Sequence, residues 1–333
     1  MSALTQRALM AFRLQRWEVG ASVVGAIGLA AVMVWFSWQL QAVAAEQLAC
    51  EQARVLTGCQ PIADRWNGLS EWGTRLLYLS WVAPFGMGLL LGAPVVAREV
   101  EQRTAALAWI LHRSRLRWLA WRVGFVAAVL IGLLAVVALA SEALSSALLP
   151  TLDLDADFTW HGRRGWLIVA RGVAALGIGL AVGALVGRTL PALLAAAFVS
   201  VLAFTAVSLG MDRWNQSEAL VVSYDVQGSG GPLEGGLMVG QRVELLDGRV
   251  VGWDEVPRGG GDMIISMGGA IYTSLDEQTG EPDEDSLVGW ERMLVVPEAL
   301  YPVVVLRESG VVIGVALLFG LLAARIVARR RPG

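Results

Sequence analysis

Charged side chains gather in one short stretch of this chain, residues 98–117, which lies between two long apolar runs. Glu99 and Glu101 stand near its start and suit the first turn of a helix, whereas the arginines near its end suit the last turn. Between them, the less polar residues recur at helical spacing, which predicts an amphipathic helix held against the membrane face. Two interpretations stay open: an interfacial helix alone, or a helix that a soluble motor protein pushes.

The remaining side chains are poorly suited to bond-making chemistry. The chain has two His, His112 and His161, and the expected topology puts them on opposite sides of the membrane. This separation argues against a Ser-His-Asp triad and against a metal site. The sequence contains no Lys, so it lacks the Lys of a Gly-x-x-x-x-Gly-Lys-Ser/Thr nucleotide loop. We therefore expect a chain that is not an enzyme and binds no cofactor, with ATP and Mg²⁺ bound by a separate subunit.

The two cysteines, Cys50 and Cys59, are nine positions apart in a segment that is expected outside the cytoplasm, residues 44–75. In an oxidising exterior, such a pair predicts a disulfide that closes a small loop. Two free thiols are the alternative. The rest of this outer segment has the composition of short helices.

Arg171 lies about two turns inside an apolar run, where an ionised group is costly unless it has a partner. Glu142, near the outer end of the preceding run, is the partner that we expect for an ion pair between helices. The alternative is a charge on a substrate path. Arg307 and Glu308 also interrupt an apolar run, and for these two we expect snorkelling positions at the interface.

The elements that must position these residues are membrane spans. The chain has 333 residues, of which 56% are hydrophobic, against about 45–50% in a typical soluble domain. Six runs are apolar enough and long enough to cross a bilayer, namely residues 19–43, 76–97, 118–140, 165–187, 190–210 and 301–324. Arg188 and Thr189 alone separate the fourth run from the fifth, which predicts a tight helical hairpin.

Charge placement gives the orientation of these spans. With both termini in the cytoplasm, the inner segments hold 14 Arg and three acidic residues, whereas the outer segments hold 12 Arg and 26 acidic residues. This asymmetry follows the positive-inside rule and predicts a multi-pass protein of a bacterial cytoplasmic membrane. Residues 1–18 predict a cytoplasmic amphipathic helix that contacts lipid or a soluble partner. A cleaved signal peptide is the alternative for the first run, although that run is longer than a signal core.

Residues 211–300 differ in character from the spans. Short β-prone runs occur near residues 220–224, 242–246, 249–253, 263–267 and 293–296, separated by Gly-rich and acidic stretches. Asp247-Gly248 between two apolar runs predicts a hairpin with a two-residue turn. The fold class that we expect is therefore an all-α polytopic membrane protein with six transmembrane helices. A small β-rich extracytoplasmic domain is inserted between helices 5 and 6, and residues 301–333 form helix 6 and a basic cytoplasmic tail.

Several motifs resemble the membrane subunit of type-2 ABC export systems, most of all the actinobacterial branch. They are Val96-Ala-Arg-Glu-Val-Glu-Gln-x-Thr, followed by x-Leu-Ala-Trp and Ser-Arg-x-Arg-Trp-Leu, and Gly183-Ala-Leu-x-Gly-Arg-Thr-x-Pro-Ala192. The two-cysteine outer loop also matches. The resemblance covers most of residues 1–210, and an outer segment of this size, residues 211–300, departs from the pattern.

The resemblance implies a permease that exports a hydrophobic or amphipathic substrate with two copies of an ATP-binding subunit and a second permease, identical or homologous, and that binds no nucleic acid. Residues 98–117 would then form the coupling helix on the ATPase, with contacts from Glu99, Glu101, Arg103, Thr104, Leu107 and His112. We expect spans two and five to line the path with Phe85, Met87, Leu90, Phe198 and Phe204. The competing interpretation is a membrane sensor or scaffold whose outer domain binds a ligand or a partner protein.

Overall fold

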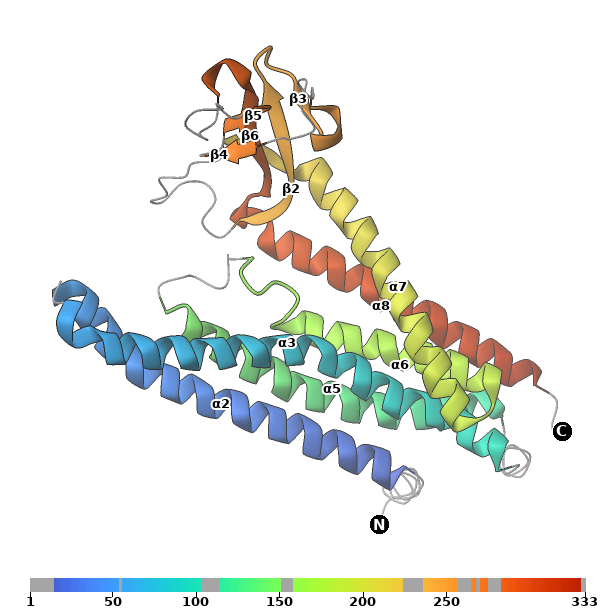
Figure 1. Ribbon diagram of the computed structural model, residues 1–333. Helices are drawn as coiled ribbons and strands as arrows, with labels where there is room; N and C mark the ends of the chain where they lie inside the picture. Colours follow the sequence, from blue (N-terminus) through green and yellow to red (C-terminus); the bar gives the residue numbers. More distant parts are fainter. Residues whose placement is uncertain are drawn as a thin grey trace. The chain divides into compact units, whose positions relative to one another are not determined.

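Long helices dominate the chain. The structure, a computed structural model, describes residues 15–53, 56–102, 114–150, 158–223, 236–256, 265–267, 270–274 and 283–330. Its helices are α2 (Arg16–Ala53), α3 (Leu56–Glu101), α5 (Arg115–Leu148), α6 (Trp166–Val186), α7 (Thr189–Glu218) and α8 (Tyr301–Arg329) (Figure 1). The contacts divide the chain into two compact units, and the second runs from residue 208 to residue 304 with a short segment before residue 160.

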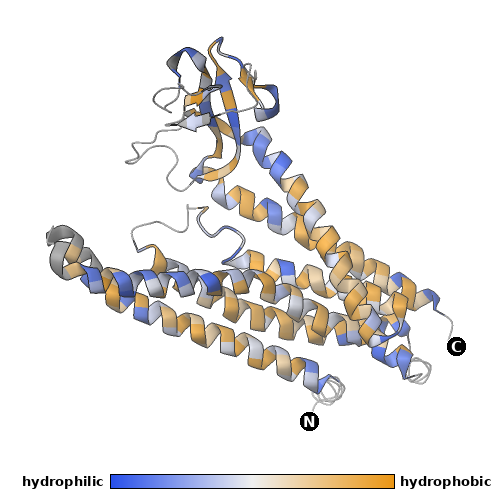
Figure 2. Ribbon diagram, in the orientation of Figure 1, coloured by the Kyte–Doolittle hydropathy of each residue, from blue (hydrophilic) through white to orange (hydrophobic). Residues whose placement is uncertain are grey.

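In the described part of the chain, six helices are long and apolar enough to cross a membrane. They correspond one to one to the six apolar runs of the sequence, and Figure 2 shows hydrophobic residues along most of their length. Some helices extend beyond the expected spans. Helix α3 runs from Leu56 to Glu101, and α5 continues to Leu148. The prediction of a helical polytopic membrane protein is confirmed.

Helix α6 lies at the centre of the first unit, and nearly all of its residues are buried. It packs against α3 at backbone distance, because glycines face each other on the two helices. A Cβ atom added at Gly88 would lie 2.5 Å from the carbonyl oxygen of Gly172, and one added at Gly183 would lie 2.4 Å from that of Ala93. Small residues permit this close approach, so the glycine-rich character of the second and fourth runs has a packing function.

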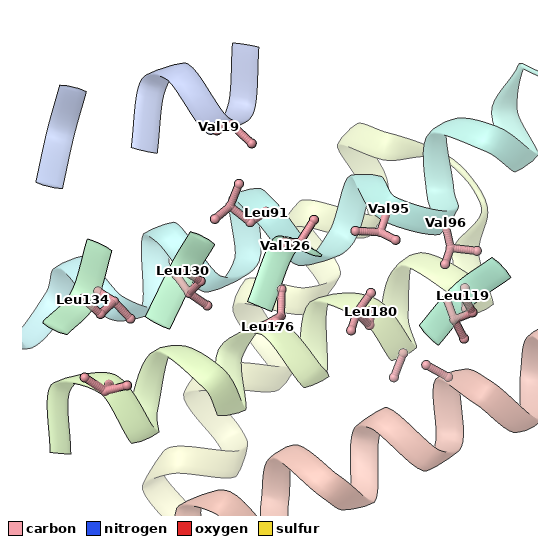
Figure 3. Close-up of a cluster of buried hydrophobic side chains, with 14 of the residues drawn as sticks. Val19, Leu91, Val95, Val96, Leu119, Val126, Leu130, Leu134, Leu176 and Leu180 are labelled. Carbon is pink, nitrogen blue, oxygen red and sulfur yellow. The ribbon is translucent and has the colours of Figure 1, made fainter. Parts of the chain in front are cut away.

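Larger apolar side chains fill the space around this seam. Leu91 and Val95 of α3, Val126 of α5, and Leu176 and Leu180 of α6 belong to one buried cluster (Figure 3). Helix α2 packs along α3 and α5 and contributes Val19 to the same cluster. These four helices therefore share one buried apolar core, to which Ala323 and Val327 of α8 also belong.

Two connections between helices have clear local causes. Helix α6 ends at Gly187, whose left-handed backbone (φ 68°) lets its N–H donate to Gly183, and α7 begins at Thr189. The expected tight hairpin is thus confirmed. Cys50 at the end of α2 and Cys59 near the start of α3 form a disulfide, which also confirms the predicted pairing.

A small antiparallel sheet lies near the C-terminus, in the second unit. Its strands are β1 (Leu220–Ser223), β2 (Leu237–Leu245), β3 (Val250–Val251), β4 (Ile265–Met267), β5 (Ala270–Tyr272) and β6 (Leu287–Val296). The order is β3-β2-β6-β5-β4, and β1 pairs with β6. Strand β5 has no counterpart among the predicted β-prone runs, because Gly268, Gly269 and Ala270 before and at its start have low strand propensity.

The predicted hairpin exists between β2 and β3, but its turn differs from the prediction. Leu245 N–H donates to the carbonyl oxygen of Arg249 at 2.9 Å, so three residues form the loop instead of two. Gly248 adopts φ 83°, as in the bulged three-residue hairpin loops. Hydrogen bonds from the backbone and side chain of Arg249 lower the pKa of the Asp247 carboxyl and hold its charge in the turn.

Candidate transmission site at the ends of the helices

Ion pairs at one end of the first unit connect α3 to its neighbours. Glu99 of α3 accepts from Arg122 of α5 at 2.5 Å, and the two side chains are only 11% and 7% exposed. The Arg122 guanidinium also lies 5.2 Å from the ring centre of Trp118. A buried charge needs such a partner, because leaving it alone in an apolar interior is costly. We call Glu18, Arg98, Glu99, Glu101 and Arg122 the Glu99 cluster.

Two further contacts of the Glu99 cluster reach other helices. Arg98 lies 2.5 Å from Glu18 of α2. Glu101 accepts hydrogen bonds from the backbone N–H and the hydroxyl of Thr189, at 2.9 and 2.7 Å. A carboxylate in this position caps the first turn of α7 and interacts favourably with its dipole. One turn at the end of α3 is thus bonded to α2, α5 and α7.

The start of α5 has its own connection. Ser114 caps α5 by accepting from the backbone N–H of Arg117 at 3.2 Å. Arg115 donates to the carbonyl oxygen of Arg330 at 2.6 Å, and Arg330 donates to the carbonyl oxygen of Ala184 in α6 at 2.5 Å. Both ends of the segment between α3 and α5 are therefore bonded to other helices of the unit.

The six residues expected at the ATPase contact differ in where the structure places them. Glu99 is buried against Arg122 of α5, and its contact with an ATP-binding subunit stays a prediction. Glu101 is exposed, although Thr189 occupies one of its oxygens. The other four lie outside the described residues, namely Arg103, Thr104, Leu107 and His112. Sequence reasoning missed Arg122, although an Arg one turn inside an apolar run is a signal for a buried partner.

A second polar group lies at the opposite end of α6. Arg171 donates to Glu308 of α8 at 2.5 Å and to the carbonyl oxygen of Gly162. His161 Nε2 lies 2.8 Å from the other oxygen of Glu308. Arg164, whose side chain is buried, contacts Glu142 of α5 at 3.0 Å. We call Glu142, His161, Arg164, Arg171 and Glu308 the Arg171 cluster.

The predicted ion pair between Glu142 and Arg171 is therefore wrong, because each residue has another partner. Gly162 and Gly165 have left-handed backbones (φ 75° and 68°), and the turn that they permit directs Arg164 toward Glu142. Arg171 is then left facing α8. Glu308, for which we expected a snorkelling position, has a side chain that is only 13% exposed and that pairs with Arg171 and His161. Its position in an apolar run was the signal that could have identified it as the partner.

The five residues expected to line a path do not come together. The rings of Phe85 and Phe204 are 4.6 Å apart and edge to face, so α3 and α7 do meet there. Met87 points instead toward α2, where it packs on the main cluster beside Gly25. Leu90 is half-buried, and Phe198 is 65% exposed on the outer face of α7. Met87 is two residues from Phe85 on α3, and Phe198 is six residues from Phe204 on α7. Residues at these spacings project from different sides of a helix, so neither side chain joins the contact between the two rings.

Two shallow grooves mark the surface of the first unit. One, of about 440 Å³, is lined by apolar residues of α2 and by Val136 of α5, among them Trp35 and Trp38. The other, of about 450 Å³, lies between the ends of α6 and α8 and has several Arg in its lining. Among the described residues, no group of three or more His, Cys, Asp or Glu could hold a metal ion.

These features define the class of the protein: a multi-pass helical membrane protein in which polar contacts connect the helix ends. A family model described as "ABC-2 membrane transporter related" matches residues 23–212, more than half of the chain. The chain belongs to this family, and the resemblance found in the sequence motifs is confirmed. The match includes most of α2, all of α3, α5 and α6, most of α7, and every residue of the Glu99 cluster except Glu18. Comparisons with curated proteins and with solved structures find no match.

Proposed function

We propose that this chain is the permease subunit of an ATP-driven exporter, which moves a hydrophobic or amphipathic substrate out of a bacterial cell. Family membership supports a permease of an ABC transporter. The complex contains two copies of a separate ATP-binding subunit, which hold ATP and Mg²⁺, and a second permease, identical or homologous. Both termini lie in the cytoplasm, and the sheet domain, inserted between the fifth and sixth spans, lies outside the cell.

The Glu99 cluster is the observation that carries this proposal. In our mechanism, residues 98–117 sit on the ATP-binding subunit and move when it closes on ATP. Because Arg98 pairs with Glu18 and Glu99 pairs with Arg122, that movement displaces α2, α3 and α5 together. The bond between Glu101 and Thr189 extends it to α7. A merely interfacial helix would have no need of ion pairs and hydrogen bonds to three other helices.

At the other end of the spans, the Arg171 cluster acts as a latch. Arg171 and His161 both contact Glu308, so one carboxylate holds α8 to α6 and to the turn before α6. Opening of an outward path separates α6 from α8 and exchanges these bonds for bonds to water. The contact between Phe85 and Phe204 lies between α3 and α7 and separates on the same movement.

The experiment uses the intact complex, isolated from membranes of the source organism through a tag on this chain. We expect ATP hydrolysis by the purified complex and ATP-dependent uptake of a fluorescent amphipathic substrate by inverted vesicles. The matched variant is Arg122→Gln, which should uncouple ATP hydrolysis from transport, so that substrate uptake falls more than ATP hydrolysis does. The same vesicles without ATP are the control.

Two results would contradict the proposal. The first is that no ATP-hydrolysing subunit co-purifies with the tagged chain, and the second is that the vesicles take up no substrate in the presence of ATP. Together they would exclude the transport function. A sensor or scaffold would then be indicated if a ligand bound to residues 211–300 changed the partner proteins that remain attached.

A further inference from the structure

The groove between the ends of α6 and α8 combines an apolar wall with a cluster of positive charge. Leu185 of α6 and Leu322 and Ile326 of α8 form the wall, and Arg325, Arg329 and Arg330 lie at its end. Its volume is about 450 Å³. All of these residues belong to the first unit, so the groove is a feature of one compact body.

Among the described residues, nothing in the lining of this groove supplies a counter-charge for its arginines. None of the described residues that line it is acidic. Arg330 is fixed by its bond to Ala184 and by the bond that Arg115 makes to its carbonyl oxygen. Arg325 and Arg329 are exposed, and within the described residues neither forms an ion pair. Two free guanidinium groups beside a fixed third favour an anion with several oxygens, such as a phosphate ester.

The apolar part of the groove is exposed on the surface of two candidate membrane spans. Leu185 is 68% exposed, and Leu318 and Leu322 are 65% and 45% exposed on α8. Leu318, Leu322, Arg325 and Arg329 follow helical spacing, so one face of α8 changes from apolar to basic toward its end. Both helices are candidate membrane spans at these positions. An occupant must therefore have an anionic head and an apolar tail.

We propose that this groove binds an anionic phospholipid. Arg325 and Arg329 hold the phosphate of its headgroup, and an acyl chain lies along Leu322 and Leu185. The membrane supplies this ligand at the depth of the groove, and acidic lipids attract basic residues at a membrane surface. An acidic protein surface would not use the exposed leucines, which lie within the spans. Bound lipid would bridge the end of α8 to the α6–α7 turn, beside the bonds of Arg330.

The test measures lipid binding to the full-length chain in detergent by native mass spectrometry. Dioleoyl phosphatidylglycerol is the probe, and dioleoyl phosphatidylcholine is the neutral comparison. We expect the double variant R325Q/R329Q to weaken phosphatidylglycerol binding by about 30-fold. R117Q/R188Q removes two exposed arginines that do not line the groove, and we expect a change below about threefold. R325K/R329K keeps the charge and should keep most of the binding.

Four outcomes would overturn the proposal. Equal binding of the two lipids would remove the anionic selectivity, and equal losses in the two double Gln variants would reduce it to net charge. Displacement of the lipid by millimolar inorganic phosphate or by glycerophosphoglycerol alone would indicate an ion site without a lipid tail. Unchanged lipid binding in R325Q/R329Q, together with loss of the ATP-binding subunit from the complex, would assign the groove to a protein partner. A normal elution profile of each variant shows that it is folded.

Discussion

Two Arg–Glu pairs in this chain have the same nitrogen–oxygen separation, 2.5 Å, but very different surroundings. Glu99 and Arg122 are buried between α3 and α5, whereas Glu71 and Arg75 are exposed on one face of α3. Solvent screens the exposed pair, and its partners lose little when they separate. The buried pair has no such alternative, because each charge has lost its water.

The first prediction compares these two pairs. Glu99→Gln leaves the Arg122 charge buried without its acid, and we expect a loss of about 3–5 kcal/mol in the free energy of unfolding. Glu71→Gln should cost less than about 1 kcal/mol. Unfolding by detergent titration, followed by tryptophan fluorescence, measures both. Equal losses in the two variants would show that the Glu99 cluster does not hold the helices.

The second prediction concerns the Arg171 cluster. Glu308→Gln removes the carboxylate shared by Arg171 and His161, and we expect a loss of about 3–5 kcal/mol in the same measurement. Glu142→Gln is the matched variant, because the Glu142 side chain is 39% exposed and water can replace it beside Arg164. Its loss should be clearly smaller.

A double variant separates charge pairing from packing in this cluster. R171M/E308M replaces both charges by apolar side chains of similar length, and we expect it to recover most of the stability lost in Glu308→Gln. If it instead unfolds as easily as Glu308→Gln, the cost does not arise from the lone Arg171 charge. Transport by this stable variant then tests whether the latch serves the transport cycle, since without it α8 would separate from α6 too readily.

At the scale of elements, the contact between α3 and α6 depends on the absence of side chains. The third prediction is that Gly88→Ala costs about 1–3 kcal/mol, because the added Cβ would overlap backbone atoms of α6. Gly132→Ala on α5 is the control, since a Cβ there meets nothing within 4 Å. We expect it to be neutral or stabilising, because Ala favours a helix more than Gly does. Similar losses in both would argue against close packing as the cause.

The disulfide joins two helices that also pack against each other through buried apolar residues. Cys50 and Cys59 join the end of α2 to the start of α3. The fourth prediction is that C50S/C59S lowers the free energy of unfolding by about 2–3 kcal/mol, the value expected for a loop of this length. The reduced wild-type chain should unfold at the same detergent fraction as this variant. A reducing agent that changes only the wild type supports the assignment, whereas an effect on C50S/C59S would not.

The whole molecule must have one orientation in the membrane, and the positive-inside rule gives it. The fifth prediction uses the cysteine-free C50S/C59S chain with one new cysteine at a time. An impermeant maleimide should label Ser266→Cys in intact cells or spheroplasts, because the proposed topology places β4 outside the cell. Ser114→Cys should be labelled only after the membrane is permeabilised. The reverse pattern would invert the topology and remove residues 98–117 from the reach of an ATPase.

Much of the organisation of this chain follows from the sequence. The six helices, the hairpin between α6 and α7, the Cys50–Cys59 pairing and the family could all be predicted from it. These features depend on local composition, on residues close together in the chain or on a motif. The bilayer makes the helices easier to predict, because a long apolar run can form all of its backbone hydrogen bonds there only as a helix or as part of a closed barrel.

Only the tertiary structure decided which side chains meet between helices. Arg171 pairs with Glu308, 137 residues away, instead of Glu142, and Glu99 pairs with Arg122 of the neighbouring helix. The rotation of each helix about its own axis settles these contacts, and that rotation depends on the packing of all neighbours together. In this chain the close contact of Gly88 with Gly172 and of Gly183 with Ala93 sets the packing of α3 on α6. The turn at Gly162 and Gly165 sets the partners of Arg164 and Arg171.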